Sequence, residues 1–397
     1  MEITLTEKQR QGLEIAVERF NKREPWTCIA GYAGTGKSTL IEFIIAALGL
    51  NKKDDVAYIT FTGKAANVLA HKNCPNAMTA HKFLYFSKKD KSGRFVFVPK
   101  TSVGNYRLVV VDEISMLPKK LWDLLLTHHI HVIALGDPFQ LPPIDKEGAN
   151  DVLDNPHIFL DQVMRQAEDS EIIKLSMNIR NGEPLPYYTG QQLQILPHDK
   201  FVDGMLDWAD QVICAKNATR FALNNQMREM RGYTDPLPQI GDKIICDHNH
   251  WQVEAYNADV ALTNGAIGYV QACYTDNITY PIWNFKRNPV PVIMADFTTQ
   301  DNEEFGYLCL DQQMFQKGKP YLTPQEEYYI TNNPRTKGDE PLIFEYGYAI
   351  TCHKAQGGEW NKVLVIEENF PFDKEEHARW LYTAITRAQD KCVLIRP

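Results

Sequence analysis

Residues 31–38 match the pattern G-x-x-x-x-G-K-[ST] at every fixed position, between a short apolar run at 26–30 and a helix-like stretch at 39–48. Glycines in such a loop let successive backbone N–H groups turn toward a polyphosphate, and the helix N-terminus adds a positive partial charge. The spacing therefore predicts a nucleoside triphosphate site, with the Lys37 ammonium on the terminal phosphates and the Ser38 hydroxyl on magnesium.

Two carboxylates, Asp112 and Glu113, follow a later apolar run at 108–111. Asp112 is placed to hold magnesium through water, and Glu113 to orient and deprotonate an attacking water. Gln140 follows the next apolar run, and its side-chain amide can bond both a phosphate oxygen and water. Taken alone, paired acids after a strand also fit a solvated turn. The phosphate loop upstream favours the catalytic interpretation.

The elements that position these groups alternate in type. Apolar runs at 28–30, 56–61, 108–111 and 131–135 are separated by amphipathic helical patterns. Continuous β-branched runs are typical of buried parallel strands. We therefore predict an α/β ATPase domain over residues 1–150.

The remaining chain predicts a second α/β domain that is split by an insert. Residues 151–240 and 341–397 carry the strand and helix patterns of this second domain. Between them, residues 241–340 lose helical periodicity and predict a β-rich insert of the SH3 or OB type, a small barrel. Two short runs around a glycine turn predict a further insert, a β-hairpin at 83–107 within the first domain.

Composition limits the class of protein. The 397 residues are 44% hydrophobic and 23% charged, with net charge −8 and eight scattered cysteines that form no C-x-x-C pair. These values favour a globular protein of a reducing cytoplasm, without a zinc or disulfide framework. No run is apolar enough to cross a membrane and the start is unlike a signal peptide, so we expect no membrane partner. The acidic balance confines any polynucleotide site to a local groove.

The order of motifs resembles that of the superfamily 1 helicases, most of all the RecD/Dda branch (superfamily 1B). The resemblance runs from residue 5 to residue 387 and rests on seven stretches besides the phosphate loop. These are motifs Ia (59–66), Ib (79–81), II (112–116), III (136–143), IV (163–166), V (348–357) and VI (381–388). The sequence departs from the family pattern in motif Ia, where Phe61 replaces a usual proline.

This resemblance implies two RecA-like P-loop domains in tandem, with ATP and Mg²⁺ bound between them. Arg165 and Arg387 would be arginine fingers on the transferred phosphoryl group, beside Lys37, Glu113 and Gln140. The implied nucleotide and metal contacts are Gln9, Gly31, Gly34, Thr35, Gly36, Lys37, Ser38, Thr39, Asp112, Gly357 and Glu359.

Two of these assignments have a competing structural interpretation. Gln9 would contact adenine, but Thr6 and Gln9 also fit a helix capping box, and one amide cannot serve both roles fully. Glu359 would bond the ribose hydroxyls, and an exposed loop acid is the equally good alternative.

The resemblance also implies a strand of nucleic acid across both ATPase domains, gripped by hydroxyls and backbone amides rather than read by sequence. The function implied is an ATP-dependent DNA helicase that moves 5′→3′ and acts in replication or recombination. We expect it to work as a monomer on single-stranded and forked DNA. Its implied protein partners are single-strand-binding or replisome proteins. Alternatives are a single-strand-stimulated ATPase that displaces proteins or remodels forks, an RNA helicase, and a P-loop NTPase without a polynucleotide. The implied contacts are Thr60, Thr62, Lys64, Thr79, His81, Phe95, Thr351 and His353.

The hairpin at 83–107 stands where this family carries its strand-separation pin. Its turn is rich in lysine and arginine, which suits contact with a phosphate backbone. Alternation places Phe95 and Phe97 on one face, where they either stack on the last base pair or pack the hairpin itself.

Overall fold

The computed structural model describes residues 5–89, 95–142, 148, 150–164, 169–258, 260–282, 287–333, 335–336, 338–369 and 373–397. The chain forms two compact units. The first unit contains Met1–Tyr85, Pro99–Ala215 and Thr351–Pro397, and the second contains Phe86–Val98 and Lys216–Ile350. Each unit is described by itself.

The first sheet of the first unit has the strand order β3-β2-β6-β7-β1-β8, and every pairing in it is parallel. The continuous apolar runs predicted from the sequence form its central strands, which are almost wholly buried. The strands are β1 (Trp26–Gly31), β2 (Val56–Thr60), β3 (Ala77–Thr79), β6 (Leu108–Val111), β7 (His131–Gly136) and β8 (Ile158–Leu160).

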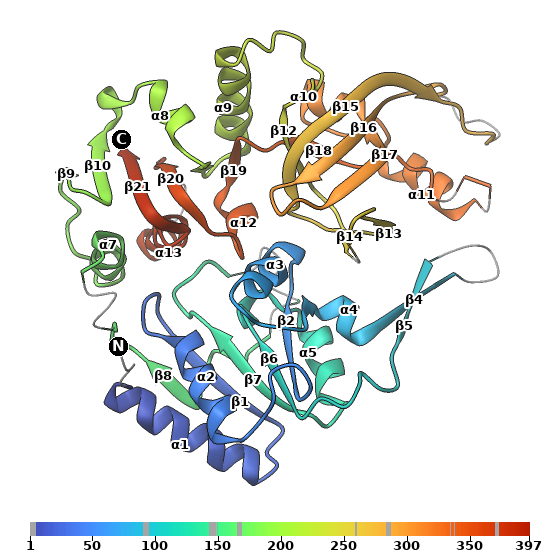
Figure 1. Ribbon diagram of the computed structural model, residues 1–397. Coiled ribbons are helices and arrows are strands. Elements are labelled where there is room, and N and C mark those ends of the chain that lie inside the picture. Colours follow the sequence, from blue (N-terminus) through green and yellow to red (C-terminus); the bar gives the residue numbers. More distant parts are fainter. Residues whose placement is uncertain are drawn as a thin grey trace. The chain divides into compact units, whose positions relative to one another are not determined.

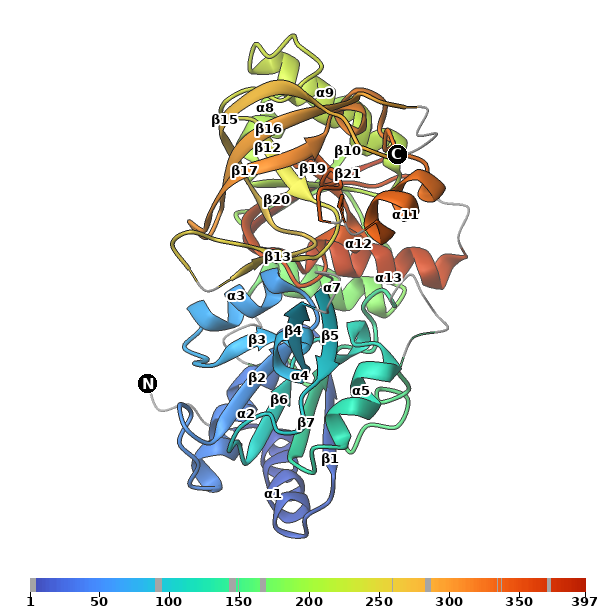
Figure 2. The same ribbon diagram turned by 90° about the vertical axis from the view of Figure 1, so that its right-hand side faces the viewer.

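Helices cover both faces of this sheet, and Figure 2 shows α2 and α5 on opposite sides of it. One face packs on α1 and α2 through residues such as Ala16 and Ile44, and the other packs on α4 and α5 through Phe83 and Trp122. The helical elements are α1 (Glu7–Asn21), α2 (Lys37–Ala47), α3 (Gly63–His71), α4 (Ala80–Leu84), η1 (Ile114–Met116) and α5 (Lys119–Leu126).

Five strands of a second sheet lie wholly in the same unit and follow the order β11-β20-β21-β10-β9, with every pairing among them parallel except β9–β10. Its strands are β9 (Tyr188–Thr189), β10 (Leu193–Pro197), β11 (Gln211–Cys214), β20 (Trp360–Ile366) and β21 (Ala388–Arg396). The helices nearby in the chain are α7 (Glu171–Arg180), η2 (His198–Lys200), α8 (Gly204–Trp208), α12 (Cys352–Ala355) and α13 (Lys374–Ile385). Two parallel sheets with helices confirm the predicted tandem α/β fold (Figure 1).

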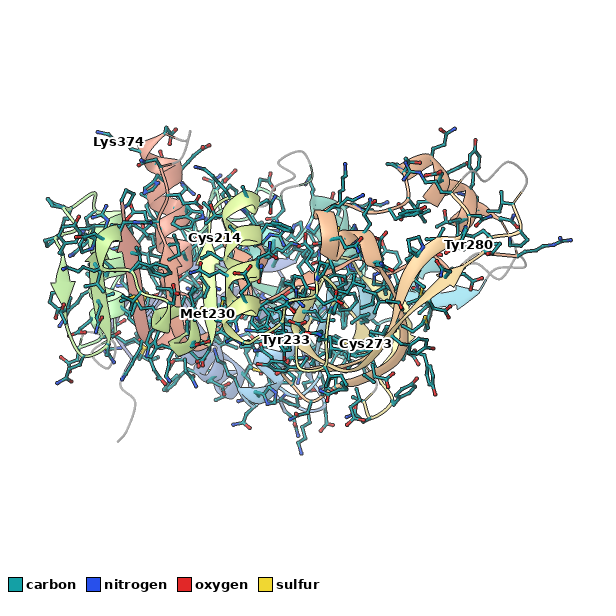
Figure 3. The ribbon with its side chains drawn as sticks, turned by 90° about the horizontal axis from the view of Figure 1, so that it is seen from above. Cys214, Met230, Tyr233, Cys273, Tyr280 and Lys374 are labelled. Atoms are coloured by element: carbon teal, nitrogen blue, oxygen red, sulfur yellow. The ribbon has the colours of Figure 1, made fainter. Side chains whose placement is uncertain are left out.

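The second unit is built on an antiparallel sheet of order β17-β16-β15-β12-β18. Its long strands alternate buried and less buried residues, as β16 does along its length. Tyr280, labelled in Figure 3, lies just beyond the end of β15 in a small apolar cluster with Val290 and Ile330. The strands are β12 (Lys243–Cys246), β13 (His250–Glu254), β14 (Ala261–Leu262), β15 (Ile267–Ile278), β16 (Val290–Thr299), β17 (Glu304–Asp311) and β18 (Phe344–Tyr346).

Helices α9 (Asn217–Met230), α10 (Gln312–Lys317) and α11 (Pro324–Asn332) also belong to the second unit, and in β19 (Ala349–Thr351) the chain returns to the first. The hairpin strands β4 (Tyr85–Lys89) and β5 (Phe95–Pro99) pair as a two-stranded sheet, while residues 90–94 lie outside the described residues. The domain boundaries predicted from the sequence stay predictions, because the compact units divide the chain along different lines.

Candidate nucleotide site and nucleic-acid interface

The phosphate loop connects the end of β1 to the start of α2. Gly34 and Gly36 have φ values of 74° and 76°, a left-handed conformation that glycine adopts without strain. A side chain at Gly36 would also collide with Met164 and with the amide of Gln9. The loop therefore needs glycine at this position for both conformation and space.

The Lys37 ammonium lies over the loop itself. Its Nζ donates to the carbonyl oxygens of Gly31 at 2.7 Å and Tyr32 at 3.0 Å. These acceptors hold the charge beside the position where the loop's N–H groups would receive phosphates. The arrangement fits the predicted role of Lys37 on the terminal phosphates.

Gln9 supports the loop from α1. The capping box is formed, because the Gln9 backbone N–H donates to Thr6 Oγ1 and its Oε1 accepts from the Thr6 N–H at 2.9 Å. The same amide donates through Nε2 to the Thr35 carbonyl at 3.1 Å, and Gln9 is 1% exposed. Contact with adenine stays a prediction, and it would have to use the second N–H of this amide.

Asp112 and Glu113 directly follow the carboxyl end of β6, and both are half-buried. Burial raises the pKa of both carboxyls, and the nearby charges of Lys37 and Arg387 lower the pKa of Asp112 and Glu113 respectively. Glu113 has a φ of 51°, which is uncommon for a residue with a side chain and is frequent at functional sites.

The predicted magnesium ligands lie together. Ser38 and Asp112 both line one cavity of about 280 Å³ beside α2, together with Tyr58, Lys72 and Cys74. Within the described residues no group of three or more His, Cys, Asp or Glu side chains is arranged to hold a metal. A hydroxyl and one carboxylate suit Mg²⁺, which usually completes its shell with water and substrate phosphates.

Arg387 brings a charge from the end of α13 to this carboxylate pair. Its Nη1 lies 3.9 Å from Glu113 Oε1, and the side chain is 5% exposed. In the amide orientation that satisfies both neighbours, Gln140 donates to Glu113 Oε2 at 3.2 Å and accepts from Arg387 Nη2 at 3.3 Å. Three residues predicted from three separate motifs thus form one group.

A buried tyrosine, which the sequence analysis did not select, connects the phosphate loop to the same region. The Tyr382 hydroxyl donates to Asp137 Oδ2 at 2.5 Å and accepts from the Ala33 backbone N–H at 2.7 Å. Burial raises the pKa of Tyr382 well above its usual value, so the hydroxyl keeps the proton that it donates. Asp137 and Tyr382 stand inside the motif stretches at 136–143 and 381–388, which is the signal that could have found them.

Motif III and motifs V and VI are joined by further hydrogen bonds at Leu141. Its N–H donates to Thr383 Oγ1 at 2.8 Å, and its carbonyl accepts from Gln356 Nε2 at 2.7 Å. Gln356 and Thr383 are buried and were also missed from the sequence. These contacts tie segments near residues 140, 356 and 383 into one polar network.

Three of the four predicted hydroxyl contacts to nucleic acid already have partners within the chain. Thr60 Oγ1 donates to the Thr62 carbonyl at 2.8 Å. Thr62 and Thr79 cap the N-termini of α3 and α4 through their own hydroxyls, whereas Thr351 stands at the N-cap of α12 without a capping bond from its side chain. The contribution of these four residues to a strand grip stays a prediction.

The aromatic and basic members of the predicted interface are partly buried. His81 stacks on Tyr85 with ring centroids 6.0 Å apart, and Lys64 Nζ lies 3.5 Å from the centre of the Trp360 ring. Burial lowers the pKa of His81 and His353, which favours their neutral forms. Neutral imidazoles suit stacking and hydrogen bonding more than charge pairing.

The other predicted residues are placed as follows. Glu359 accepts hydrogen bonds from Lys72 and Gln389, each at 2.7 Å, so a ribose contact would have to share this carboxylate. Gly357 has a φ of 73°, and a side chain there would press on Thr62. Phe95 lies on β5 but its side chain is outside the described part, as is the whole of Arg165. Both roles stay predictions.

Similar proteins were found at both the sequence and the structure level. The family model described as an AAA domain matches residues 4–204, and that of the UvrD-like helicase C-terminal domain matches residues 346–395. The ATP-dependent RecD2 DNA helicase of Deinococcus radiodurans is 28% identical over 374 residues, covering 91% of this chain and 46% of the relative. The ATP-dependent DNA helicase dda of Enterobacteria phage T4 is 28% identical over 212 residues, covering 50% and 45%. The chain thus spans less than half the length of these two relatives.

A crystal structure of Pif1 helicase from Bacteroides, in complex with ADP-AlF3 and ssDNA, is similar to this fold with a TM-score of 0.53. It is 17% identical and covers 100% of this chain and 93% of that one. Among the helices of the described residues, none combines the length and apolarity needed to cross a membrane.

Proposed function

Because the chain belongs to the AAA domain family and is a superfamily 1B helicase of the RecD, Dda and Pif1 type, we propose that it is an ATP-dependent DNA helicase. One observation carries the proposal. Arg387 and Gln140 meet Glu113 beside the phosphate loop, so groups from both parallel sheets converge on one carboxylate. Such a site couples ATP hydrolysis to movement of one ATPase domain against the other, which a stepping motor requires.

We assign the roles within the site from this geometry. Gly34, Gly36 and the start of α2 receive the phosphates, and Lys37 neutralises the terminal ones. Glu113 accepts the proton of the attacking water, which Gln140 helps to orient. When Mg²⁺ is bound by Ser38 and Asp112, it neutralises charge on the phosphates.

Arg387 stabilises the charge that develops on the transferred phosphoryl group, and Arg165 is proposed as a second finger on the resemblance alone. Through its hydrogen bonds to Ala33 and Asp137, Tyr382 couples phosphate binding at the loop to the position of motif III. The contact of Gln9 with adenine and that of Glu359 with ribose are retained as proposals on the same resemblance.

The proposed nucleic-acid substrate is single-stranded and forked DNA, gripped near Lys64, His81 and His353. Movement in the 5′→3′ direction, action as a monomer in the cytoplasm, and the hairpin of β4 and β5 as the strand-separating element are parts of this proposal that rest on the resemblance. Displacement of proteins without unwinding, and action on RNA, are the rival functions of the same site.

The proposal is tested by ATP hydrolysis rates measured with no polymer, with single-stranded DNA and with RNA. We expect DNA to stimulate the rate strongly, and Lys37→Ala to abolish it in every case. A duplex with a 5′ single-stranded tail should then be unwound in preference to one with a 3′ tail. Stimulation by RNA alone would favour the RNA helicase, and stimulated hydrolysis without unwinding would favour the remodelling ATPase.

A further inference from the structure

A cavity of about 510 Å³ lies in the first unit, away from every group that the nucleotide site uses. It stands where the strands of the first sheet begin, since Pro25 precedes β1, Arg107 precedes β6 and His131 opens β7. The phosphate loop and Asp112 follow the other ends of β1 and β6. In a parallel sheet the strands begin on one side and end on the opposite side, so an occupant of this cavity would leave the nucleotide site accessible.

One wall of the cavity is apolar and is fixed in place. Phe20, Leu126 and Ile130 line it. His131 beneath them is 8% exposed, with its two ring nitrogens hydrogen-bonded to the Glu24 carbonyl at 2.7 Å and Thr27 Oγ1 at 3.1 Å, and its ring meets Phe20 edge-on at 5.3 Å. A preformed apolar wall of this kind can receive an aliphatic or aromatic side chain.

The rim of the same cavity is basic. Arg23, Arg107 and His129 line it and are exposed. Neither arginine side chain makes an ion pair or a hydrogen bond with any other part of the chain that the structure describes. Two guanidinium groups over an apolar wall thus have their charge available to a ligand.

Two of the basic residues on this rim have a left-handed backbone conformation, which glycine adopts with less strain. Arg23 ends α1 with a φ of 57°, and His129 ends the turn after α5 with a φ of 55°. Glycine takes this conformation most easily, and the same chain uses it where α2, α7, α9 and α10 end. Those glycines are Gly49, Gly182, Gly232 and Gly318, with φ values between 62° and 80°. At the cavity, basic side chains stand in two positions where glycine would be less strained.

We propose that this cavity binds an acidic segment of a partner protein that also carries apolar side chains. Carboxylates of the segment would pair with Arg23 and Arg107, and an apolar side chain would pack on Phe20 and Leu126. Glu24 also lines the cavity and can accept an N–H from a peptide. A nucleic-acid backbone has no such donor, and Glu24 would repel its phosphates, so the observations favour a peptide.

The experiment measures fluorescence anisotropy of a short labelled peptide of alternating Asp and Leu, titrated with the full chain. We expect the wild type to bind it, and to bind Asp/Ser and Lys/Leu peptides at least about tenfold more weakly. Arg107→Ala should weaken binding of the Asp/Leu peptide by about tenfold, the scale of a lost charge-assisted contact.

Glycine variants supply the sharper test. Arg23→Gly and His129→Gly should each weaken peptide binding while leaving the melting temperature unchanged or higher, because glycine relieves the left-handed backbone. Asn73→Gly is the matched control, since Asn73 has a φ of 58° after α3 and does not line the cavity. It should change neither peptide binding nor ATP hydrolysis.

Unchanged binding in Arg23→Gly, His129→Gly and Arg107→Ala would overturn the proposal. If the Asp/Ser peptide bound as tightly as the Asp/Leu peptide, the apolar wall would have no part in binding, and the proposal as stated would be overturned. Displacement of the peptide by oligothymidine would show that the cavity takes a phosphate backbone, which also contradicts it. None of these outcomes depends on helicase activity, which is measured separately on the same variants.

Discussion

Two arginines, one in each unit, are equally buried and yet are held in different ways. Arg387 in the first unit is 5% exposed and Arg228 in the second is 4% exposed. Arg228 makes two bonds of 3.0 Å to the Asp242 carboxylate and two more to backbone carbonyls. Arg387 bonds to Thr383, Gly358 and Thr386, and its nearest carboxylate, on Glu113, is 3.9 Å away.

The difference separates a structural charge from a functional one. A buried charge that has a close bidentate partner is neutralised within the fold, and its removal leaves the partner uncompensated. A buried charge whose partner stands farther off keeps part of its field for a ligand that develops negative charge nearby. By this comparison we assign Arg228 a structural role in the second unit, and we retain Arg387 as the proposed arginine finger.

The largest expected effect is on turnover. Arg387→Ala should lower kcat for ATP by about a thousandfold or more, the scale of an arginine finger, with a much smaller change in KM. Phosphate release at saturating ATP measures it, and Arg387→Lys should recover little because an ammonium cannot bond bidentately. A pure KM effect would make Arg387 a ground-state clamp and break the comparison.

The corresponding change in the second unit should act on stability instead. Arg228→Ala leaves the Asp242 carboxylate buried without its cation, at a cost of about 3–5 kcal/mol in the free energy of unfolding. Urea unfolding measures this loss. Arg231→Ala, which removes a neighbouring exposed arginine, is the control and should cost far less. A small loss in Arg228→Ala would show that its pairing is dispensable.

Glu113→Gln should reduce turnover by about a hundredfold while preserving nucleotide binding, because a general base is lost. Since burial raises the pKa of Glu113 in the folded state, ionisation costs more there than in the unfolded chain. The stability that this group provides is present below its unfolded pKa and is lost as pH rises through the folded one. At neutral pH the glutamine variant should therefore melt no lower than the wild type. Loss of nucleotide affinity instead would make Glu113 a structural residue.

Tyr382→Phe should produce the smallest effect of the series. It leaves the Ala33 N–H and Asp137 without their shared hydroxyl, a loss of about 1–3 kcal/mol that should appear in kcat/KM for ATP. Tyr348→Phe is the matched control, because its hydroxyl donates to Asp242 at 2.9 Å in the second unit. That variant should lose stability without changing ATP kinetics. If both variants changed ATP kinetics alike, the hydroxyl of Tyr382 would have no special role.

The sequence predicted the first unit better than the second, for physical reasons. Glycines of the phosphate loop and acids after a strand have fixed spacing because phosphate and metal geometry demand it, so Lys37 and Asp112 could be selected from residue types alone. Gln140 was selected because its amide follows the next apolar run, and Arg387 through the motif resemblance; the structure places both against Glu113.

Ion pairs that depend on tertiary packing carried no such signal. Arg220 and Glu345 are 125 residues apart, and they pair only because the fold brings α9 beside β18. Arg228 and Asp242 are only 14 residues apart, but no local pattern places the end of α9 against the residue that precedes β12. Tyr382 was hidden for a related reason, since its partners Ala33 and Asp137 stand hundreds of residues earlier. The basic cavity draws residues from three separate segments and was likewise not visible in the sequence.

The central claim is that Arg387 acts on the charge of the transferred phosphoryl group. Its most direct test is calorimetric binding of ADP alone and of ADP with aluminium fluoride, an analogue of that group in transfer, to the wild type and to Arg387→Ala. The account predicts that the variant binds ADP as the wild type does but loses about a hundredfold or more of its affinity for the aluminium fluoride complex. Equal affinity of variant and wild type for that complex, or an equal loss for both ligands, would contradict it.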